Sequence, residues 1–408
     1  MRDRTFFLGW RLALAIFSVT LLATSTWAAD RETVLHSFGN GTDGADPYGA
    51  SLIFDAAGNL YGTTRDGGIH GEGTVFKLSP KEGGGWTETV LHSFENGTDG
   101  ADPLAGLIFD AAGNLYGTTW LGGLHGFGTV FELSPHGGSW TETVLHSFGS
   151  GTDGTQPLVS LIFDAAGNLY GTTYEGGIHG AGTVFELSPG QGGGWTEKVL
   201  HSFGSGTDGA YPLYGVSLTG SAGNLYGTTY EGGIHGLGTV FELSPSGGGN
   251  WTEKVLHSFG SGADGASPYA ELIFDTSGNL YGTTFAGGIH SSGTVFELSP
   301  SGGDWTEKVL HSFGNGTDGT EPFASLIDAA GNIYGTTIGG GLHGAGTAFE
   351  LSPRDDGSWT ETELHSFSDG SDGGYPYAGL IFDRAGNLYG TTWQGGIHGA
   401  GTAFEITP

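Results

Sequence analysis

Two sets of side chains in this sequence have types that could bind a ligand, and each set occurs seven times. An aspartate followed by glycine recurs in one kind of glycine-rich segment, and a histidine recurs in segments of the type GG-x-H. Carboxylates and imidazoles can hydrogen-bond glycan hydroxyls or ligate cations. We therefore predict a ligand-binding face formed by Asp43, Asp99, Asp153, Asp208, Asp264, Asp318 and Asp372 together with His70, His125, His179, His235, His290, His343 and His398.

The repetition also supports a structural role for the same residues. A residue that is present seven times more often maintains a fold than performs a unique reaction. In this alternative, each GG-x-H histidine bonds an aspartate or a backbone group of a neighbouring loop and holds the loops together. No catalytic residue is assigned, because no nucleophile–base pair and no distinct pair of carboxylates stands apart from the repeats.

Metal binding is weakly indicated. Motifs such as HExxH or an EF-hand loop are absent, and the histidines lie too far apart in sequence for a compact ligand motif. The N-G-T-D-G-A-D segments are rich in oxygen ligands but lack the closing bidentate glutamate of a calcium loop. We assign no metal ligands, and calcium remains an alternative cofactor.

Two further repeated residues are predicted to be structural. A second histidine lies in the phrase LHSF, on the strand face that also carries Val and Phe, as a half-buried structural residue: His36, His92, His146, His201, His257, His311 and His365. The tryptophan of the phrase WTE is expected to cover an outer strand edge, and a sugar-stacking platform is the alternative.

The elements that position these residues follow from a repeat of about 55 residues, visible as seven copies of GNLYGTT or close variants. Each unit contains four short apolar or alternating runs separated by turn residues, which is the pattern of strands. Seven four-stranded units predict an all-β, seven-bladed β-propeller, and a linear β-solenoid is the alternative. The chain starts with an LHSF-type strand and finishes with a TVFEL-type strand. We therefore predict that residues 32–38 pair with residues 402–406 and close the last blade.

Composition narrows the classes of partner. Residues 1–28 have a positive front, an apolar stretch and a small-residue cleavage site, which predicts a signal peptide followed by one propeller domain at residues 29–408. No later segment is apolar enough to span a membrane after cleavage. The formal net charge of −31 disfavours nucleic acid and anionic lipid surfaces as partners. With no cysteine, an exported chain gains nothing from disulfides.

The sequence resembles a known tandem repeat. The phrases DG-x-x-P, D-x-x-GNLYGTT and GG-x-HG-x-GTVFEL-x-P are similar to the repeat called GloVer, over residues 32–408. The resemblance implies a secreted or surface-located protein and implies no enzyme activity. Members often carry a C-terminal sorting anchor, whereas this sequence ends at Pro408 without one, so we expect a secreted or periplasmic protein.

These observations favour a monomeric binding or scaffold module whose partner is an extracellular polysaccharide or a surface protein. The alternative is a propeller enzyme, a lyase or hydrolase that acts on carbohydrate or on a small cyclic ester. A structural protein with no small ligand is the third option. A multivalent binder should lose affinity gradually as copies are removed, whereas an enzyme should fail after one substitution.

Overall fold

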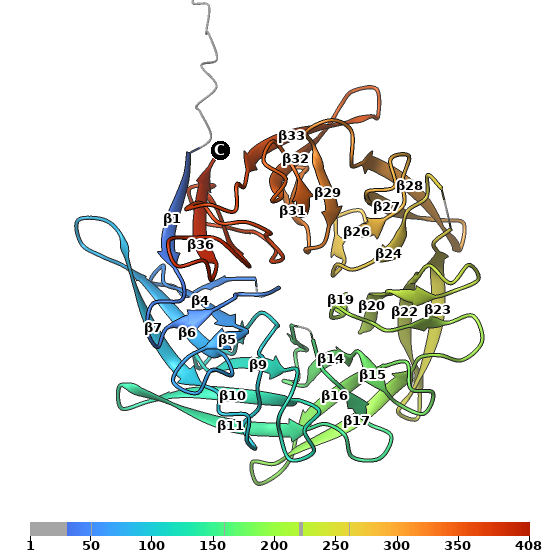
Figure 1. The fold of residues 1–408 in the computed structure, drawn as a ribbon. Helices are drawn as coiled ribbons and strands as arrows, with labels where there is room; N and C mark the ends of the chain where they lie inside the picture. Colours follow the sequence, from blue (N-terminus) through green and yellow to red (C-terminus); the bar gives the residue numbers. More distant parts are fainter. Residues whose placement is uncertain (1–30, 50, 159, 220–222, 261) are drawn as a thin grey trace, which may run out of the picture.

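The computed structural model describes residues 31–49, 51–158, 160–219, 223–260 and 262–408. The signal peptide predicted at residues 1–28 lies outside these residues. The strands form seven antiparallel sheets that surround a central axis like blades (Figure 1). The described part of the chain contains no helix, and therefore no helix that could cross a membrane. The predicted all-β, seven-bladed β-propeller is confirmed.

Each blade has four main strands, and we number the blades 1 to 7 by their innermost strands. The innermost strands are β3 (Ile53–Phe54), β8 (Ile108–Phe109), β13 (Ile162–Phe163), β19 (Ser217–Thr219), β25 (Ile273–Phe274), β30 (Ile327–Ala329) and β34 (Ile381–Phe382). The second strands are β4 (Leu60–Thr64), β9 (Leu115–Thr119), β14 (Leu169–Thr173), β20 (Asn224–Thr229), β26 (Leu280–Ala286), β31 (Asn332–Gly340) and β35 (Leu388–Thr392).

The outer half of each blade is a longer hairpin. The third strands are β6 (Thr74–Pro80), β10 (Thr129–His136), β16 (Thr183–Pro189), β22 (Thr239–Gly247), β27 (Thr294–Ser301), β32 (Thr347–Pro353) and β36 (Thr402–Thr407). The outermost strands are β7 (Trp86–Ser93), β11 (Ser139–Ser147), β17 (Trp195–Ser202), β23 (Asn250–Ser258), β28 (Asp304–Ser312), β33 (Trp359–Ser366) and β1 (Arg31–Ser37).

Short pairings that the repeat pattern did not predict tie the loops of one face together. They join the loop that enters a blade to the loop between its second and third strands. The strands are β2 (Gly44–Ala45) with β5 (Asp66–Gly67), β12 (Gly154–Thr155) with β15 (Glu175–Gly176), and β18 (Gly209–Ala210) with β21 (Glu231–Gly232). In blades 5 and 6, β24 (Ala266–Pro268) and β29 (Gly319–Pro322) pair directly with the second strand.

The first strand of the chain closes the ring. Strand β1 pairs antiparallel with β36, from Arg31 opposite Thr407 to Ser37 opposite Thr402. The next residue, Phe38, is fully buried and donates its backbone N–H to Gly401 O at 3.0 Å. Its side chain belongs to an apolar cluster that contains residues of both blade 7 and blade 1. The predicted closure is therefore confirmed, and it brings both ends of the described chain together (Figure 1).

The repeated phrases build the core between blades. In blade 1, Val75, Phe76 and Leu78 of the third strand are fully buried. A Cβ on Gly62 would lie 2.8 Å from the Phe76 ring, so only glycine leaves room for this ring to cover the second strand. The WTE tryptophan packs edge-on against the NLYGTT tyrosine of the preceding blade, as Trp140 does against Tyr61 with ring centroids 6.4 Å apart.

Candidate functional site

The aspartates of the predicted ligand face are held by the LHSF histidines. In the last blade, His36 Nε2 lies 3.1 Å from Asp43 Oδ2, and the Gly39 backbone N–H donates to Asp43 Oδ1 at 3.0 Å. The equivalent histidine–aspartate pairs lie 3.1 to 3.5 Å apart in all seven copies. Burial lowers the pKa of His146, against the opposing effect of Asp153, so this imidazole tends toward its neutral form. The LHSF histidine thus bonds the aspartate of its own loop.

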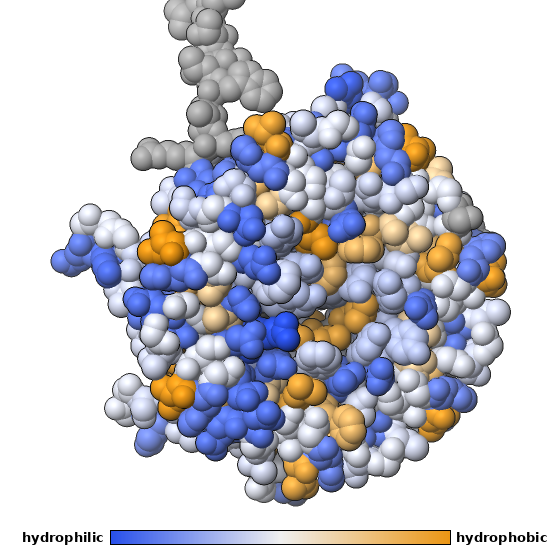
Figure 2. Space-filling view, viewed as in Figure 1, coloured by the Kyte–Doolittle hydropathy of each residue, from blue (hydrophilic) through white to orange (hydrophobic). Residues whose placement is uncertain are grey.

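The GG-x-H histidines lie on the same face but are exposed. All seven histidines are solvent-exposed. Each follows an exposed Ile or Leu whose accessible fraction is 67–75%: Ile69, Leu124, Ile178, Ile234, Ile289, Leu342 and Ile397. Apolar patches accordingly surround the periphery of the face in Figure 2. Within the described residues, no group of three or more His, Asp or Glu side chains is arranged to hold a metal ion.

A second repeated carboxylate is the partly buried glutamate of each outermost strand. The glutamate of each WTE phrase, and Glu32 at the equivalent position of β1, buries Oε1 without a hydrogen-bond partner: Glu32, Glu88, Glu142, Glu197, Glu253, Glu307 and Glu361. Burial, assisted by the charge of Asp264, raises the pKa of Glu307 to about 7. This side chain lines a cavity of about 620 Å³ together with Asp264 and His257. Sequence reasoning did not identify these glutamates.

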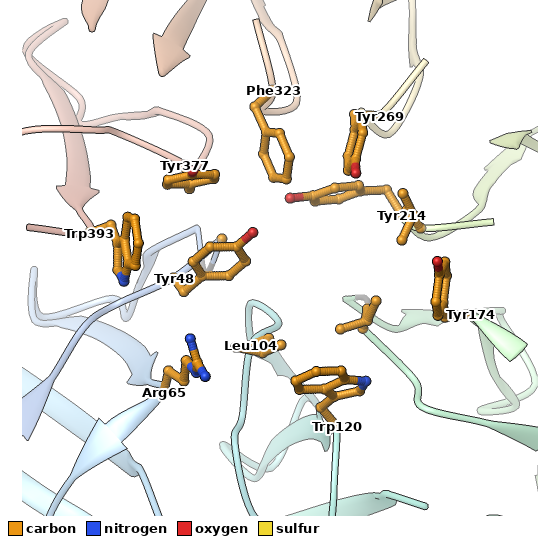
Figure 3. A pocket seen from close by; sticks show the side chains of 13 residues that line it. Tyr48, Arg65, Leu104, Trp120, Tyr174, Tyr214, Tyr269, Phe323, Tyr377 and Trp393 are labelled. Atoms are coloured by element: carbon orange, nitrogen blue, oxygen red, sulfur yellow. The ribbon is translucent and has the colours of Figure 1, made fainter. Parts of the chain in front are cut away.

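The largest departure from sevenfold repetition is a cavity at the centre of the same face. Its volume is about 430 Å³. Aromatic side chains from all sides of the ring point into it (Figure 3). The lining residues are Tyr48, Gly49, Arg65, Leu104, Trp120, Leu158, Tyr174, Leu213, Tyr214, Tyr269, Phe323, Tyr377 and Trp393.

Most of the lining comes from two positions of the repeat. One position follows the proline of DG-x-x-P and supplies Tyr48, Leu104, Leu158, Leu213, Tyr269, Phe323 and Tyr377. The other follows GTT and supplies Arg65, Trp120, Tyr174 and Trp393. The side chains at these two positions differ from unit to unit. The sequence signal for the cavity was therefore variation among the units.

Backbone geometry holds the two variable positions side by side. The residue before the proline is left-handed in every blade although it is never glycine: Asp46, Asp102, Gln156, Tyr211, Ser267, Glu321 and Tyr375, with φ between 52° and 61°. In blade 1, the carbonyl of Asp46 accepts the N–H of Arg65 at 3.0 Å, and its own N–H donates to Ala400 O of blade 7 at 2.9 Å. Residues held in this sparsely populated region often cluster at functional sites.

Ring contacts connect the aromatic side chains across the cavity. Tyr48 stacks on Tyr377 with centroids 4.6 Å apart and an interplanar angle of 28°. Phe323 contacts Tyr377 edge-on at 4.8 Å and Tyr269 at 4.4 Å. Trp393 meets Tyr377 at 5.5 Å. These contacts restrict the rings to defined orientations before any ligand enters.

Blade 1 supplies a polar edge to the cavity. Arg65 Nε lies 3.7 Å from Asp66 Oδ2 and has no hydrogen-bond partner in the protein. Burial, with the charge of Asp66 and a hydrogen bond that protonated Asp46 donates to it, raises the pKa of Asp46 to about 6. Burial also raises the pKa of Asp102, against the opposing charge of Arg65. One guanidinium therefore lies among three carboxyl groups, beside the aromatic wall.

The fold and cavity define a class of protein, a repeat-built propeller with one asymmetric central site. Residues 15–220 and 213–408 match the Gloeobacter/Verrucomicrobia repeat. The chain belongs to this repeat family. None of the curated proteins matches it.

Solved structures share the propeller fold at low identity. A candidate 6-phosphogluconolactonase from Bacteroides uniformis has a TM-score of 0.50 and 15% identity, over 83% of this chain and 88% of that chain. An ancestral GH74 enzyme has a TM-score of 0.56 and 12% identity, over 93% of this chain and 51% of that chain. At such identities the likeness shows the fold alone.

Proposed function

We propose that this protein is an exported binding module that takes a neutral glycan into its central cavity. The observation that carries the proposal is the convergence of the non-repeated side chains on one aromatic cavity with one polar edge. Ligand sites in proteins are typically concave, rich in aromatic side chains and provided with a few polar groups. The predicted N-terminal signal segment supports export to the compartment where extracellular polysaccharide is found.

The chemistry of the lining matches a sugar. Tyr and Trp side chains offer broad apolar surfaces with a polar tip, which suit the C–H face of a pyranose ring. Each sugar hydroxyl both donates and accepts, so neighbouring hydroxyls can bond the Arg65 guanidinium and the Asp46 or Asp66 carboxyl at once. The aromatic wall and the polar edge thus suit the two kinds of surface of one sugar.

The charge of the site favours a neutral glycan over an acidic one. The guanidinium of Arg65 is already beside Asp66, and Asp46 and Asp102 add further carboxyl groups nearby. The whole chain carries a formal net charge of −31. An anionic sugar would therefore approach a negative surface without an unpaired cation to receive it.

Titration calorimetry with oligosaccharides of matched geometry tests this function. The set consists of β-1,4-linked glucose and glucuronate, and of galactose and galacturonate oligomers. We expect binding to at least one neutral member and weaker binding to its acidic counterpart. Trp120→Ala should reduce the affinity about tenfold or more, as for a central aromatic anchor. Trp140→Phe, at an inter-blade position, is the matched control. Equal binding by the Trp120→Ala variant, or preference for the acidic members, would contradict the proposal.

A further inference from the structure

One cavity residue has no counterpart in the other blades. Blade 4 carries Tyr214 two residues after its proline, at a position one residue deeper along the channel than the other aromatic positions. Blades 2, 5, 6 and 7 have alanine there, as Ala105, Ala270, Ala324 and Ala378. Blade 4 thus carries one long aromatic side chain at a position where four other units carry a methyl group.

Tyr214 extends across the channel from blade 4 toward blade 1 (Figure 3). Its hydroxyl lies 3.5 Å from the point that a Cβ on Gly49 would occupy. Gly49 belongs to the only unit with an extra residue between the proline and the inner-strand leucine. The Tyr214 ring also contacts Phe323 at 5.6 Å and Tyr269 at 6.4 Å. Burial raises the pKa of Tyr214 well above its usual range.

The inner ends of neighbouring blades contact one another around the channel. A Cβ on Gly106 would lie 2.8 Å from Ser160 Oγ and 3.2 Å from the Ser51 carbonyl. On the other side, the Gly379 N–H donates to Ser51 Oγ at 3.1 Å. At this level of the channel, blade 7 therefore contacts blade 1, blade 1 contacts blade 2, and blade 2 contacts blade 3.

We infer that the cavity receives the terminal residue of a glycan chain and excludes internal residues. This inference rests on the proposed glycan-binding function. An internal sugar continues into a neighbour at both ends, so it needs two exits from a site that encloses it. Tyr214 is one of the residues that line the cavity of about 430 Å³, and its side chain extends across the channel (Figure 3), so we take it as the floor of the site. A chain end needs only one opening.

The number of binding sites on one polymer before and after fragmentation tests this inference. The probe is a neutral β-glucan or galactan that the protein binds, compared at equal mass as the intact polymer and after partial acid hydrolysis. We expect the number of protein molecules bound per gram of glycan to rise in proportion to the number of chain ends. An unchanged number would overturn end recognition while leaving glycan binding intact. Binding to neither form would instead contradict the proposed function.

Variants of Tyr214 test the floor itself. Tyr214→Ala removes the obstruction and should let the protein bind the intact polymer at more sites per gram than the wild type does. Tyr214→Phe keeps the ring and loses only the hydroxyl, so it should retain the preference for chain ends. Circular dichroism and thermal unfolding establish that both variants are folded. If Tyr214→Ala binds with the same dependence on chain ends as the wild type, Tyr214 does not restrict the site.

Discussion

Replacement of Glu307 by glutamine should stabilise the protein at alkaline pH and leave its stability unchanged at acidic pH. Glu307 lies on β28, and its buried Oε1 has no hydrogen-bond partner. Asp264 of the loop after β23 and His257 of β23 line the same cavity as Glu307, and so does His311. Burial is the main cause that raises the pKa of Glu307 to about 7, with Asp264 adding to the shift and His257 opposing it.

The sign and size of the effect follow from proton linkage. An unfolded glutamate releases its proton near pH 4.5, whereas folded Glu307 keeps it until about pH 7. The free energy of unfolding contributed by this group is therefore greatest below pH 4.5 and is lost as the pH rises toward 7. A pKa unit corresponds to about 1.4 kcal/mol. Because the side chain is only half-buried and solvent screens its charge, the effect is smaller than the full shift would give. We expect the Glu307→Gln variant to be about 1–2 kcal/mol more stable than the wild type at pH 8.

Urea unfolding of the wild type and the Glu307→Gln variant at several values between pH 4.5 and 8 measures the difference. The variant should gain about 1–2 kcal/mol at pH 8, and the gain should fall to near zero at pH 4.5. Glu82→Gln, at an exposed position, is the control and should show no such trend. A gain that is the same at every pH would refute the protonation argument, because it would reflect packing alone.

Three further substitutions test the architecture. Phe38→Ala should lower the free energy of unfolding by about 3–5 kcal/mol. Phe94→Ala should cost as much, because both side chains are fully buried. A far smaller loss for Phe38→Ala in urea unfolding would mean that the propeller opens where β1 pairs with β36. Gly44→Ala would place a Cβ 2.2 Å from Thr64 Oγ1, so its thermal unfolding temperature should fall clearly; an unchanged temperature would contradict this packing. Asp153→Asn should destabilise the chain by about 1–3 kcal/mol without changing glycan affinity, and a loss of affinity without a loss of stability would assign the aspartates to the ligand site.

Periodicity predicted the fold because it reports burial and turns. Four apolar runs per unit predicted the four main strands of each blade. The strand at residues 32–38, which precedes the first full unit, predicted the closure with β36. The two-residue pairings such as β2 with β5 were missed, because their glycine-rich segments carry no apolar alternation. They depend on contacts between loops that only the assembled blade creates.

The candidate site was harder to predict because repetition drew attention to the residues that recur in every unit and away from those that vary. The predicted Asp and His sets do share one face, but each aspartate lies within 3.1 to 3.5 Å of an LHSF histidine, while the GG-x-H histidines remain exposed. The central cavity is built from residues that differ between units, such as Arg65 and Trp120. In a closed ring these positions converge on the axis, and a linear sequence does not show that convergence.

The most direct test of the central claim is a glycan array probed with the wild type and with the Trp120→Ala/Trp393→Ala double variant. Both tryptophans line the cavity, and neither indole N–H has a partner in the protein. We predict that the wild type binds neutral glycans and that the double variant, with an unchanged unfolding temperature, loses those signals. An array on which the wild type binds no glycan, or on which the folded double variant binds the same glycans equally well, would contradict the assignment of the cavity as the binding site.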